Sequence, residues 1–302
     1  MTASFVNNRY DFVYLFDVQD GNPNGDPDLA NTPRFDPETF QGLVSDVCLK
    51  RKIRDWVFAK KSESGKPQAG YDVFVLQGHS LESRQKMPYD HLKIPPKTDD
   101  RGKIAEARNW MCANFFDVRA FGAVMSTTDF NCGQVRGPVQ ITFARSIDRI
   151  LSSEHGITRV AYTKEEKKAS TTASTEMGNK HTVAYGLYRA HGFVNAHLAA
   201  PPNGTGFHDG DLALLWSALT NMFDLDHSAA RGLMAARRLI VFKHASALGE
   251  APAHRLFDLV TVRRKEGIES PRAFGDYQVT PIDEIRKGVA AAFPQVEVLD
   301  LI

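Results

Sequence analysis

The side chains in this sequence that could do chemistry include an acidic, amide-rich loop near the N-terminus. Residues 20–25 read DGNPNG and match the opening of a calcium-binding loop, D-x-N-x-N-G. The twelfth position of such a loop carries a bidentate Glu, but Asn31 stands there, and Pro23 and Pro27 stiffen the segment. We therefore interpret these residues as a turn-rich loop and expect no metal ion in it.

Other catalytic patterns in the sequence are incomplete. His208-Asp209 and Asp226-His227 are isolated acid–histidine pairs, without the further His and Asp ligands that a metal phosphohydrolase needs. The sequence has no GxxxxGK[ST] phosphate loop, no GxSxG nucleophile elbow and no HExxH zinc motif. The three cysteines are too scattered for a disulfide framework or a CxxC zinc site: Cys48, Cys112 and Cys132. The sequence therefore predicts neither a cofactor nor a metal.

Charge is segregated along the chain, although the formal net charge is only +1. Between residues 11 and 38 seven acids stand against one base, Arg34, and between residues 49 and 61 six bases stand against one acid, Asp55. A second basic stretch, without acids, runs through residues 227–249 and includes Arg231. Such blocks are either solvated faces or parts of a surface that binds a polyanion such as nucleic acid.

The first basic block has the periodicity of a helix, which we predict over residues 40–61. At 100° per residue Leu49, Ile53 and Trp56 share one face of this helix. The side away from that face collects the cations Lys50, Arg51, Arg54 and Lys61. Such a stripe suits a phosphate backbone, because the planar fork of Arg can engage two phosphate oxygens. A solvated amphipathic helix explains the same pattern.

The elements that must position these residues alternate between strands and helices. We predict strands at residues 10–18, 71–76, 137–145, 181–199, 239–243 and 256–262, and helices at 40–61, 104–116 and about 211–223. Either Asp209 or Asp211 is expected to cap the last helix. Residues 20–37 and 92–103 should be loops, and residues 147–180 should be polar and irregular.

The strongest of these elements follow the order βαββαβ. This order is typical of an α+β, ferredoxin-like fold, which RNA-recognition modules also use. Two insertions interrupt it, at residues 62–131 and 148–180, and the first could instead be a separate domain. The 302 residues contain no apolar run long enough to span a membrane, and the N-terminus lacks the apolar core of a secretory signal. We therefore expect a cytoplasmic protein.

Several motifs in a fixed order identify a family resemblance. They are GNPNGDP at 21–27, LKRKIR at 49–54, QVRGPVQITFARSID at 134–148, MGNKHTVAYGLY at 177–188 and GFVNAHLA at 192–199. With these motifs, essentially the whole chain resembles the backbone subunit of the type I-C CRISPR surveillance complex, Cascade. That subunit forms CRISPR-associated family seven of the repeat-associated RNA-binding superfamily.

The resemblance implies a modified RNA-recognition palm with inserted fingers and a protruding thumb. On this basis residues 1–61 and 132–147 belong to the palm, 62–131 to the fingers, 148–180 to the thumb, and 181–302 to the palm and C-terminal elements. Copies of such a subunit stack head to tail along the CRISPR guide RNA, together with other Cascade subunits. Target DNA then binds by pairing with the guide, and each thumb interrupts that pairing. The subunit itself does not cut.

Candidate RNA contacts come from the matched motifs. On the helix, Lys50, Arg51 and Arg54 are expected to hold guide phosphates. Arg136 lies in a glycine-rich segment that permits close approach of a ligand to the backbone. In the thumb, a flexible Met can wedge beside a base while a Lys meets phosphate. The complete set of expected RNA-binding residues is Asn22, Asn24, Lys50, Arg51, Arg54, Gly133, Gln134, Arg136, Met177 and Lys180.

The alternative function is a metal-dependent ribonuclease that cleaves target RNA. The resemblance supplies this alternative, because related backbone subunits of type III complexes cleave RNA with an aspartate between the first strand and the first helix. This loop holds Asp20, Asp26, Asp28 and Asp36, and Asp36 lies shortly before the LKRKIR helix. Since the motifs match type I-C, we expect a scaffold without catalytic residues.

Overall fold

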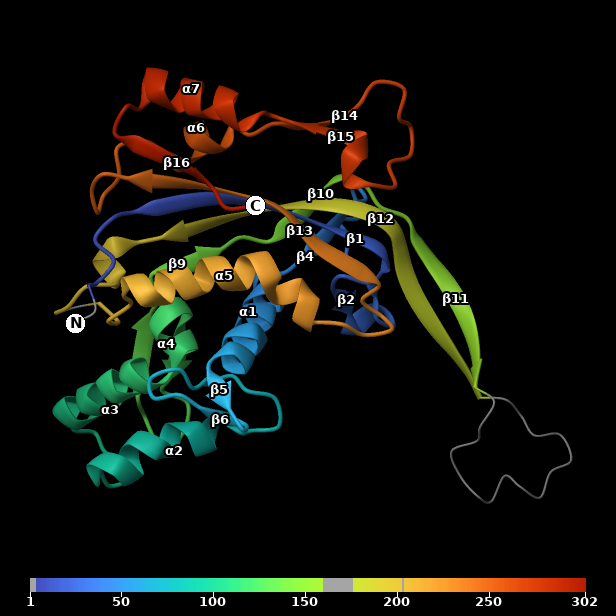
Figure 1. Ribbon diagram of the computed structural model, residues 1–302. Helices are drawn as coiled ribbons and strands as arrows, with labels where there is room; N and C mark the ends of the chain where they lie inside the picture. Colours follow the sequence, from blue (N-terminus) through green and yellow to red (C-terminus); the bar gives the residue numbers. More distant parts are fainter. Residues whose placement is uncertain (1–3, 160–175, 203) are drawn as a thin grey trace, which may run out of the picture.

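A large antiparallel sheet forms the centre of the computed structural model, which describes residues 4–159, 176–202 and 204–302. Its strand order is β16-β13-β1-β12-β10-β4, and β9 and β11 also pair with β12 (Figure 1). The strands are β1 (Tyr10–Gly21), β4 (Gln41–Val44), β9 (Val139–Ile141), β10 (Ala144–Arg149), β11 (Ser152–Arg159), β12 (Glu176–Val194), β13 (Leu233–His244) and β16 (Val296–Asp300).

Strand β1 is covered on both faces of the sheet. Phe12, Tyr14 and Phe16 pack into the core beneath the helices α1 (Asp46–Lys60) and α5 (Asp209–Leu225). The alternate residues Val13 and Leu15 pack into a second core on the opposite face. Double coverage explains why this strand reads as a nearly continuous apolar run rather than as an alternating one.

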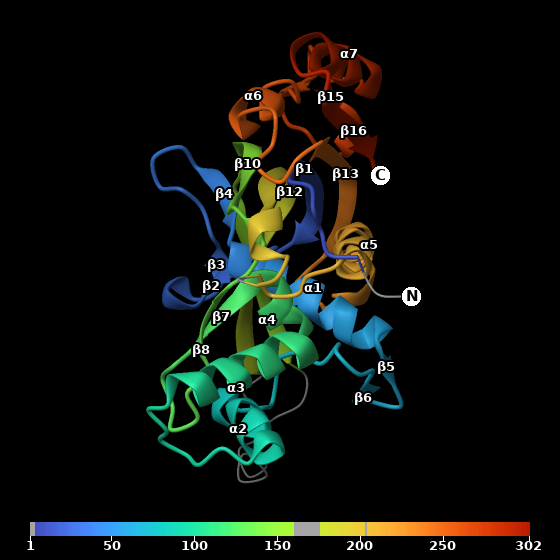
Figure 2. The ribbon, with the colours of Figure 1, turned by 90° about the vertical axis from the view of Figure 1, so that its left-hand side faces the viewer.

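The second core lies under a C-terminal layer. This layer comprises α6 (Ala253–Phe257), α7 (Ile282–Ala292) and the hairpin of β14 (Val262–Arg264) and β15 (Tyr277–Val279). Leu256, Ile285 and Val289 are buried against the sheet. Figures 1 and 2 show this layer on the side of the sheet away from α1 and α5.

A helical unit with its own small core lies below the sheet in Figures 1 and 2. It contains α2 (Leu81–Leu92), α3 (Arg101–Asn114), α4 (Phe116–Phe121), β7 (Gly122–Met125) and β8 (Gly133–Arg136), with the small hairpin β5 (Ser62–Glu63) and β6 (Lys66–Pro67) beside it. Its core includes Phe74, Tyr89, Met111 and Phe115. We call the part from Ser62 to Arg136 the helical unit.

A two-stranded ribbon projects from the right-hand end of the sheet in Figure 1. It consists of β11 and the paired part of β12, in register from Ser152 opposite Val183 to Arg159 opposite Glu176. Residues 160–175, which join the two strands, lie outside the described residues. Near the start of α1, the chain forms β2 (Gly25–Asp26), β3 (Thr32–Pro33) and a 3-10 turn at Pro27–Leu29 between them.

Most of the strongest sequence predictions agree with these elements. The strands predicted at 10–18 and 239–243 lie within β1 and β13, and the helices predicted at 104–116 and 211–223 correspond to α3 and α5. The strand predicted at 137–145 is divided into β9 and the start of β10. None of the helices among the described residues is long and apolar enough to cross a membrane.

Two of the predicted elements are wrong in the region of α1 and the helical unit. The helix predicted from residue 40 begins only at Asp46, because residues 41–44 pair with β10 as β4 and Ser45 caps the helix by accepting from the amide of Cys48. No strand forms at residues 71–76. The Asp117 carboxylate accepts from the amides of Phe74 and Val75, so these groups are not available to a neighbouring strand.

Three further predictions are corrected by the structure. The cap of α5 is His208, whose ring accepts from the Asp211 amide, while the Asp211 carboxylate accepts from the His208 amide. Residues 256–261 form the end of α6 and a turn rather than a strand, and β14 begins only at Val262. The described ends of the segment predicted to be irregular, residues 147–180, are ordered as the ribbon, because antiparallel pairing satisfies their backbone groups.

Candidate nucleic-acid interface

The GNPNGDP loop fixes the start of helix α1. Asn24 Oδ1 accepts from the amide of Ser45 at 2.9 Å and from its hydroxyl at 3.0 Å. Ser45 in turn caps α1 through its contact with the Cys48 amide. Asn24 therefore helps to position the cationic helix α1 through its contacts with Ser45.

The first part of the same loop is packed inside the protein. Asn22 is 3% exposed, and its Nδ2 donates to the Asn31 carbonyl at 2.7 Å. A Cβ on Gly21 would lie 1.9 Å from the Arg231 carbonyl oxygen, so only glycine fits. Among the residues that the structure describes, none forms a hydrogen bond with the buried Oδ1 of Asn22. The side chain is nevertheless too enclosed to meet a ligand directly.

The predicted cations of α1 differ in their exposure. Lys50 Nζ lies 3.0 Å from Asp46 Oδ2, and Arg54 Nε lies 2.9 Å from Asp117 Oδ2. Their side chains are only 13% and 12% exposed. Arg51 is 44% exposed and holds Asp226 Oδ1 loosely, at 3.4 Å. Of the three, Arg51 is the cation that α1 presents best to a phosphate.

Asp226 is the centre of a cationic cluster that sequence reasoning missed. Its carboxylate contacts Arg51, Lys52 and Arg231, whose Nε lies 3.2 Å away. Lys52 is fully buried. Burial, with the neighbouring charges of Arg231 and Arg51, outweighs the attraction of Asp55 and lowers the pKa of Lys52 to about 7. In the sequence the basic block at 49–61 and the acid-free stretch around Arg231 contained these cations, but nothing there showed that they share Asp226.

The glycine-rich segment around Arg136 belongs to the helical unit. Gly133 begins β8 with φ +71°, beside Ile104 and the aliphatic part of Arg108 on α3. Gln134 and Arg136 are exposed on β8. Within the described part of the chain, no carboxylate lies within ion-pair distance of Arg136. Arg136 is therefore well placed to contact an anion.

The two predicted thumb residues lie on the ribbon. Lys180 is opposite His155 in the antiparallel register and is half-buried. The backbone of Met177 pairs with Thr158. Both positions thus lie on the part of β12 that pairs with β11 and extends beyond the rest of the sheet (Figure 1).

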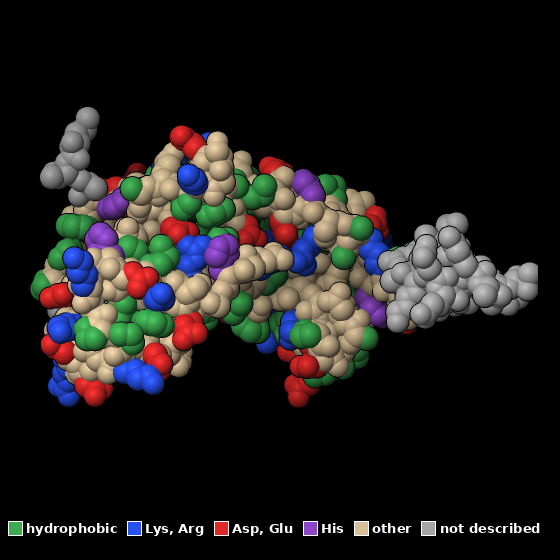
Figure 3. All heavy atoms as spheres, turned by 90° about the horizontal axis from the view of Figure 1, so that it is seen from below, with side chains coloured by type: hydrophobic (Ala, Val, Ile, Leu, Met, Phe, Trp, Pro, Cys, Tyr) green, Lys and Arg blue, Asp and Glu red, His purple; other side chains and the backbone are tan. Residues whose placement is uncertain are grey.

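The structure therefore does not bring the predicted residues into one site but divides them among three places. Asn22, Asn24 and the cations of α1 lie at the sheet, Gly133 to Arg136 lie in the helical unit, and Met177 and Lys180 lie on the ribbon. Figure 3, viewed from below, shows a notch in the surface between the helical unit and the lobe nearest the ribbon. Lys and Arg side chains on this face are mixed with acids.

The candidate acid for cleavage, Asp36, is held by an arginine. Its Oδ2 lies 2.8 Å from Arg145 Nη1, and this hydrogen bond, with that from the Glu38 amide, lowers the pKa of the Asp36 carboxyl. Among the residues that the structure describes, no three His, Cys, Asp or Glu side chains are grouped so as to hold a metal ion. The candidate acid is thus engaged within the protein by Arg145.

A cavity of about 1000 Å³ lies between the sheet and the β14–β15 hairpin, and sequence reasoning did not find it. Tyr277 donates to Asp148 at 2.7 Å, and Arg264 Nε lies 3.1 Å from the same carboxylate. Burial and this hydrogen bond raise the pKa of Tyr277. Arginines and carboxylates are both present in the lining, so the cavity has no clear preference for anions or cations.

Comparison with known proteins gives a consistent family assignment. The profile of the family described as "CRISPR-associated protein Cas7" matches residues 8–281. A protein of Haloferax volcanii with that same description is 28% identical over 237 residues. The match covers 71% of this chain and 65% of the Haloferax protein, which is less than two thirds of that relative.

Solved structures of CRISPR complexes contain chains that resemble this one. One chain, from a "CRISPR RNA-guided surveillance complex", has a TM-score of 0.49 and 13% identity, and the match covers 97% of this chain and 87% of that chain. A second, from such a complex described as "pre-nicking", has a TM-score of 0.48 and 14% identity over 78% of each chain. A third, from a type III-B Cmr-beta complex bound to cognate target RNA, has a TM-score of 0.39 and 10% identity, covering 78% of this chain and 61% of that chain.

Proposed function

The chain belongs to the CRISPR-associated Cas7 family, and on this basis we propose that it is the non-catalytic backbone subunit of a type I-C Cascade complex. In this function it binds CRISPR guide RNA, stacks head to tail with copies of itself, joins other Cascade subunits and displays the guide to target DNA in the cytoplasm. The observation that carries the proposal is the family match over residues 8–281, which includes the helical unit, the ribbon and every strand of the sheet except the edge strand β16.

The topology supports a ferredoxin-like palm in this proposal. Along the chain, β1, α1, the β9–β10 segment, β12, α5 and β13 follow the order βαββαβ. In the sheet β1 lies between β13 and β12, with both α1 and α5 on one face. The helical unit then corresponds to the fingers and the ribbon to the thumb. Strand β8 pairs with β7, which extends the proposed fingers to Arg136.

Exposure divides the proposed RNA contacts into two groups. Among the predicted residues, Arg51 and Arg136 are exposed cations and Lys180 is a half-buried cation on the ribbon, and we assign phosphate contacts to these three. Lys50, Arg54, Asn22 and Asn24 make contacts within the chain, and they act on RNA binding through the position of α1. The protein would hold RNA by its backbone and leave the reading of sequence to base pairing.

Co-purification tests the proposed function. The chain is expressed with the other Cascade subunits, with and without a CRISPR array, and the complexes are sized and their RNA extracted. We expect a large complex containing guide RNA only when the array is present. A complex of unchanged size that lacks RNA in both cases would contradict the proposal.

Substitutions test the division of the contacts. Arg51→Ala should weaken RNA binding by a similar factor for all guide sequences and reduce its salt dependence, because one phosphate contact is lost. Lys60→Ala, an exposed change on the same helix, is the matched control. Equal affinity and an equal salt slope in Arg51→Ala and wild type would remove Arg51 from the interface.

Ribonuclease activity is tested in the same preparation. The assembled complex is incubated with complementary RNA and Mg²⁺, and the scaffold function predicts that the RNA stays intact. Cleavage at regular intervals that disappears in Asp36→Ala would establish the enzyme instead.

A further inference from the structure

Helix α4 is the contact between the helical unit and the sheet. All six residues of α4 are buried, including the charged pair Asp117 and Arg119. These two side chains have opposite charge, lie two residues apart and reach different helices of the sheet layer. Charged side chains are rarely buried without a partner, so each of them has a defined role in this contact.

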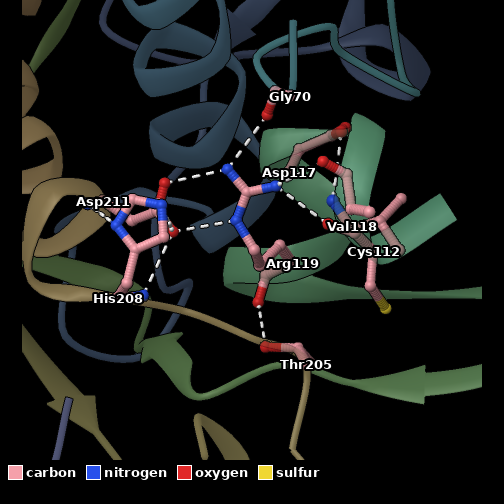
Figure 4. A network of polar contacts seen from close by, with 9 residues as sticks. Gly70, Cys112, Asp117, Val118, Arg119, Thr205, His208 and Asp211 are labelled. Carbon is pink, nitrogen blue, oxygen red and sulfur yellow. Dashed lines mark hydrogen bonds and ion pairs between the residues drawn. The ribbon is translucent and has the colours of Figure 1, made fainter. Parts of the chain in front are cut away.

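Arg119 links the helical unit to α5 (Figure 4). Its Nε and Nη2 lie 2.8 and 2.9 Å from the two oxygens of Asp211, a bidentate ion pair. Nη1 donates to the Cys112 carbonyl at 2.8 Å and Nη2 to the Gly70 carbonyl at 3.0 Å. The side chains of Arg119 and Asp211 are 6% and 0% exposed. The pair is thus enclosed, and its hydrogen-bonding groups are satisfied.

The surroundings of this pair hold it in one orientation. Asp211 also accepts from the His208 amide at the start of α5. Thr205 Oγ1 donates to the Arg119 carbonyl at 2.7 Å. The Tyr71 ring lies near both Arg119, at 5.6 Å, and Lys61 at the end of α1, at 4.5 Å.

Asp117 links the same helix to α1. Its Oδ2 lies 2.9 Å from Arg54 Nε and accepts from the Val75 amide at 3.0 Å, while its Oδ1 accepts from the Phe74 amide at 2.7 Å. The side chains of Asp117 and Arg54 are 2% and 12% exposed. Helix α4 is therefore connected through buried ion pairs to both helices that cover the sheet.

Buried ion pairs are directional, whereas apolar packing is not. Desolvation offsets much of the Coulomb attraction in such a pair, so its contribution to stability is small, but a misplaced partner leaves a buried charge unpaired. Two such pairs, with opposite polarity and separate partner helices, allow one orientation of α4 and penalise the others.

We propose that the pairs Arg119–Asp211 and Arg54–Asp117 are positioning contacts that fix the orientation of the helical unit relative to the sheet. In consequence they set the distance between Arg136 on β8 and Lys180 on the ribbon. Together with the proposed function, this fixes the length of RNA that one subunit spans. Arg54 is then a positioning residue and not a phosphate ligand.

Electron spin resonance distances test the proposal on the full chain without RNA. Spin labels are placed at the exposed positions Glu82→Cys on α2 and Lys287→Cys on α7, since the three native cysteines are buried. Arg119→Met removes one ion pair. The matched control is Arg84→Met, because Arg84 also forms a buried ion pair, with Asp72, but both partners lie within the helical unit.

The wild type and Arg84→Met should give one narrow distance distribution with the same centre. Arg119→Met should give a distribution that is shifted or at least twice as broad, while the sheet still unfolds cooperatively. If Arg119→Met fails to fold, Arg119→Lys, which keeps the charge but loses the bidentate fork, should broaden the distribution less. A distribution in Arg119→Met or Arg119→Lys identical to that of the wild type would overturn the proposal.

RNA adds a readout that separates this inference from the proposed function. If wild-type complexes contain guide RNA, nuclease protection should show a regular spacing that becomes irregular in Arg119→Met and not in Arg84→Met. Altered distances in a protein that binds no RNA would support the positioning contacts and contradict the proposed function. Regular spacing in Arg119→Met despite altered distances would show that the ion pairs do not set the RNA length.

Discussion

Lys52 allows a test of whether burying a charged side chain on α1 lowers the stability of the protein. It is fully buried, whereas the other cations of α1 are exposed or partly exposed. Its ammonium contacts Asp226, which also holds Arg51 and Arg231. The substitution Lys52→Met keeps the apolar stem of the side chain and removes the buried charge. Asp226 keeps two cationic partners in the variant, so no carboxylate is left unpaired.

The pKa of Lys52 sets the size and the direction of the expected effect. Burial, together with the charges of Arg231 and Arg51, lowers this pKa from 10.5 to about 7, and that gap corresponds to about 5 kcal/mol of penalty on the charged form in the folded protein. The unfolded chain binds the proton more tightly, so the stability of the wild type rises as the pH increases from about 7 to 10.5. Below pH 7 the penalty is complete.

Lys52→Met should therefore raise the free energy of unfolding by about 1–4 kcal/mol at pH 7, after the lost contact with Asp226 is subtracted. The gain should shrink towards zero near pH 10. Urea unfolding between pH 6 and 10 measures both quantities, with the exposed Lys60→Met on the same helix as the control. If Lys52→Met is less stable than the wild type at pH 7, by an amount that does not change with pH, the ion pair is a net stabiliser and the reasoning is wrong.

Three further predictions concern other buried groups. Burial and the charge of Arg189 lower the pKa of His191 to about 4. The free energy of unfolding should therefore fall by about 1–2 kcal/mol as the pH decreases from 6.5 to 4, because the unfolded chain takes up a proton that the folded protein does not. Denaturant unfolding at the two pH values should show a smaller decrease for His191→Gln than for the wild type. Burial raises the pKa of the Cys132 thiol to about 12. A thiol reagent at pH 8 should therefore label Cys132 only when the helical unit opens, and urea should increase the rate of labelling. Rapid labelling in native buffer would contradict the burial of this thiol. Gly21→Ala places a Cβ against the Arg231 carbonyl and should lower the free energy of unfolding by about 1–3 kcal/mol or more, and an unchanged melting temperature would show that the loop can move away.

The sequence correctly predicted those elements whose own side chains favour one secondary structure. Strand β1 was predictable because aromatic and β-branched residues dominate it, and α5 because its apolar residues recur at helical spacing. Helix α2 was missed because Pro88 lies inside it and its polar residues hide the periodicity. Residues 71–76 read as a strand by composition, but the side chain of Asp117, far along the sequence, takes their amides. Contacts of this range cannot be read from local sequence.

The sequence predicted which residues of the candidate site are charged, but it did not predict which of them pair with other side chains. The sequence showed that LKRKIR is cationic, but it could not show that Asp46 and Asp117 neutralise Lys50 and Arg54. The GNPNGDP motif drew attention because it is distinctive. Its distinctiveness reflects packing at Asn24, which fixes the start of α1, as much as any contact with a ligand. Motif-based site residues in such a chain therefore combine ligand contacts with the residues that position them.

The division between exposed and paired cations also changes how strongly salt should act on RNA binding. Each phosphate contact to single-stranded nucleic acid contributes about 0.7 to the slope of log affinity against log salt. If all five predicted cations bound phosphate, one subunit would contribute about 3.5, from Lys50, Arg51, Arg54, Arg136 and Lys180. With only Arg51, Arg136 and Lys180 in contact, the slope should be about 2 for each subunit. The internal ion pairs of Lys50 and Arg54 thus predict weaker salt dependence than the sequence suggests, because a cation that is held by a carboxylate neutralises no phosphate and so releases no counterion from the RNA.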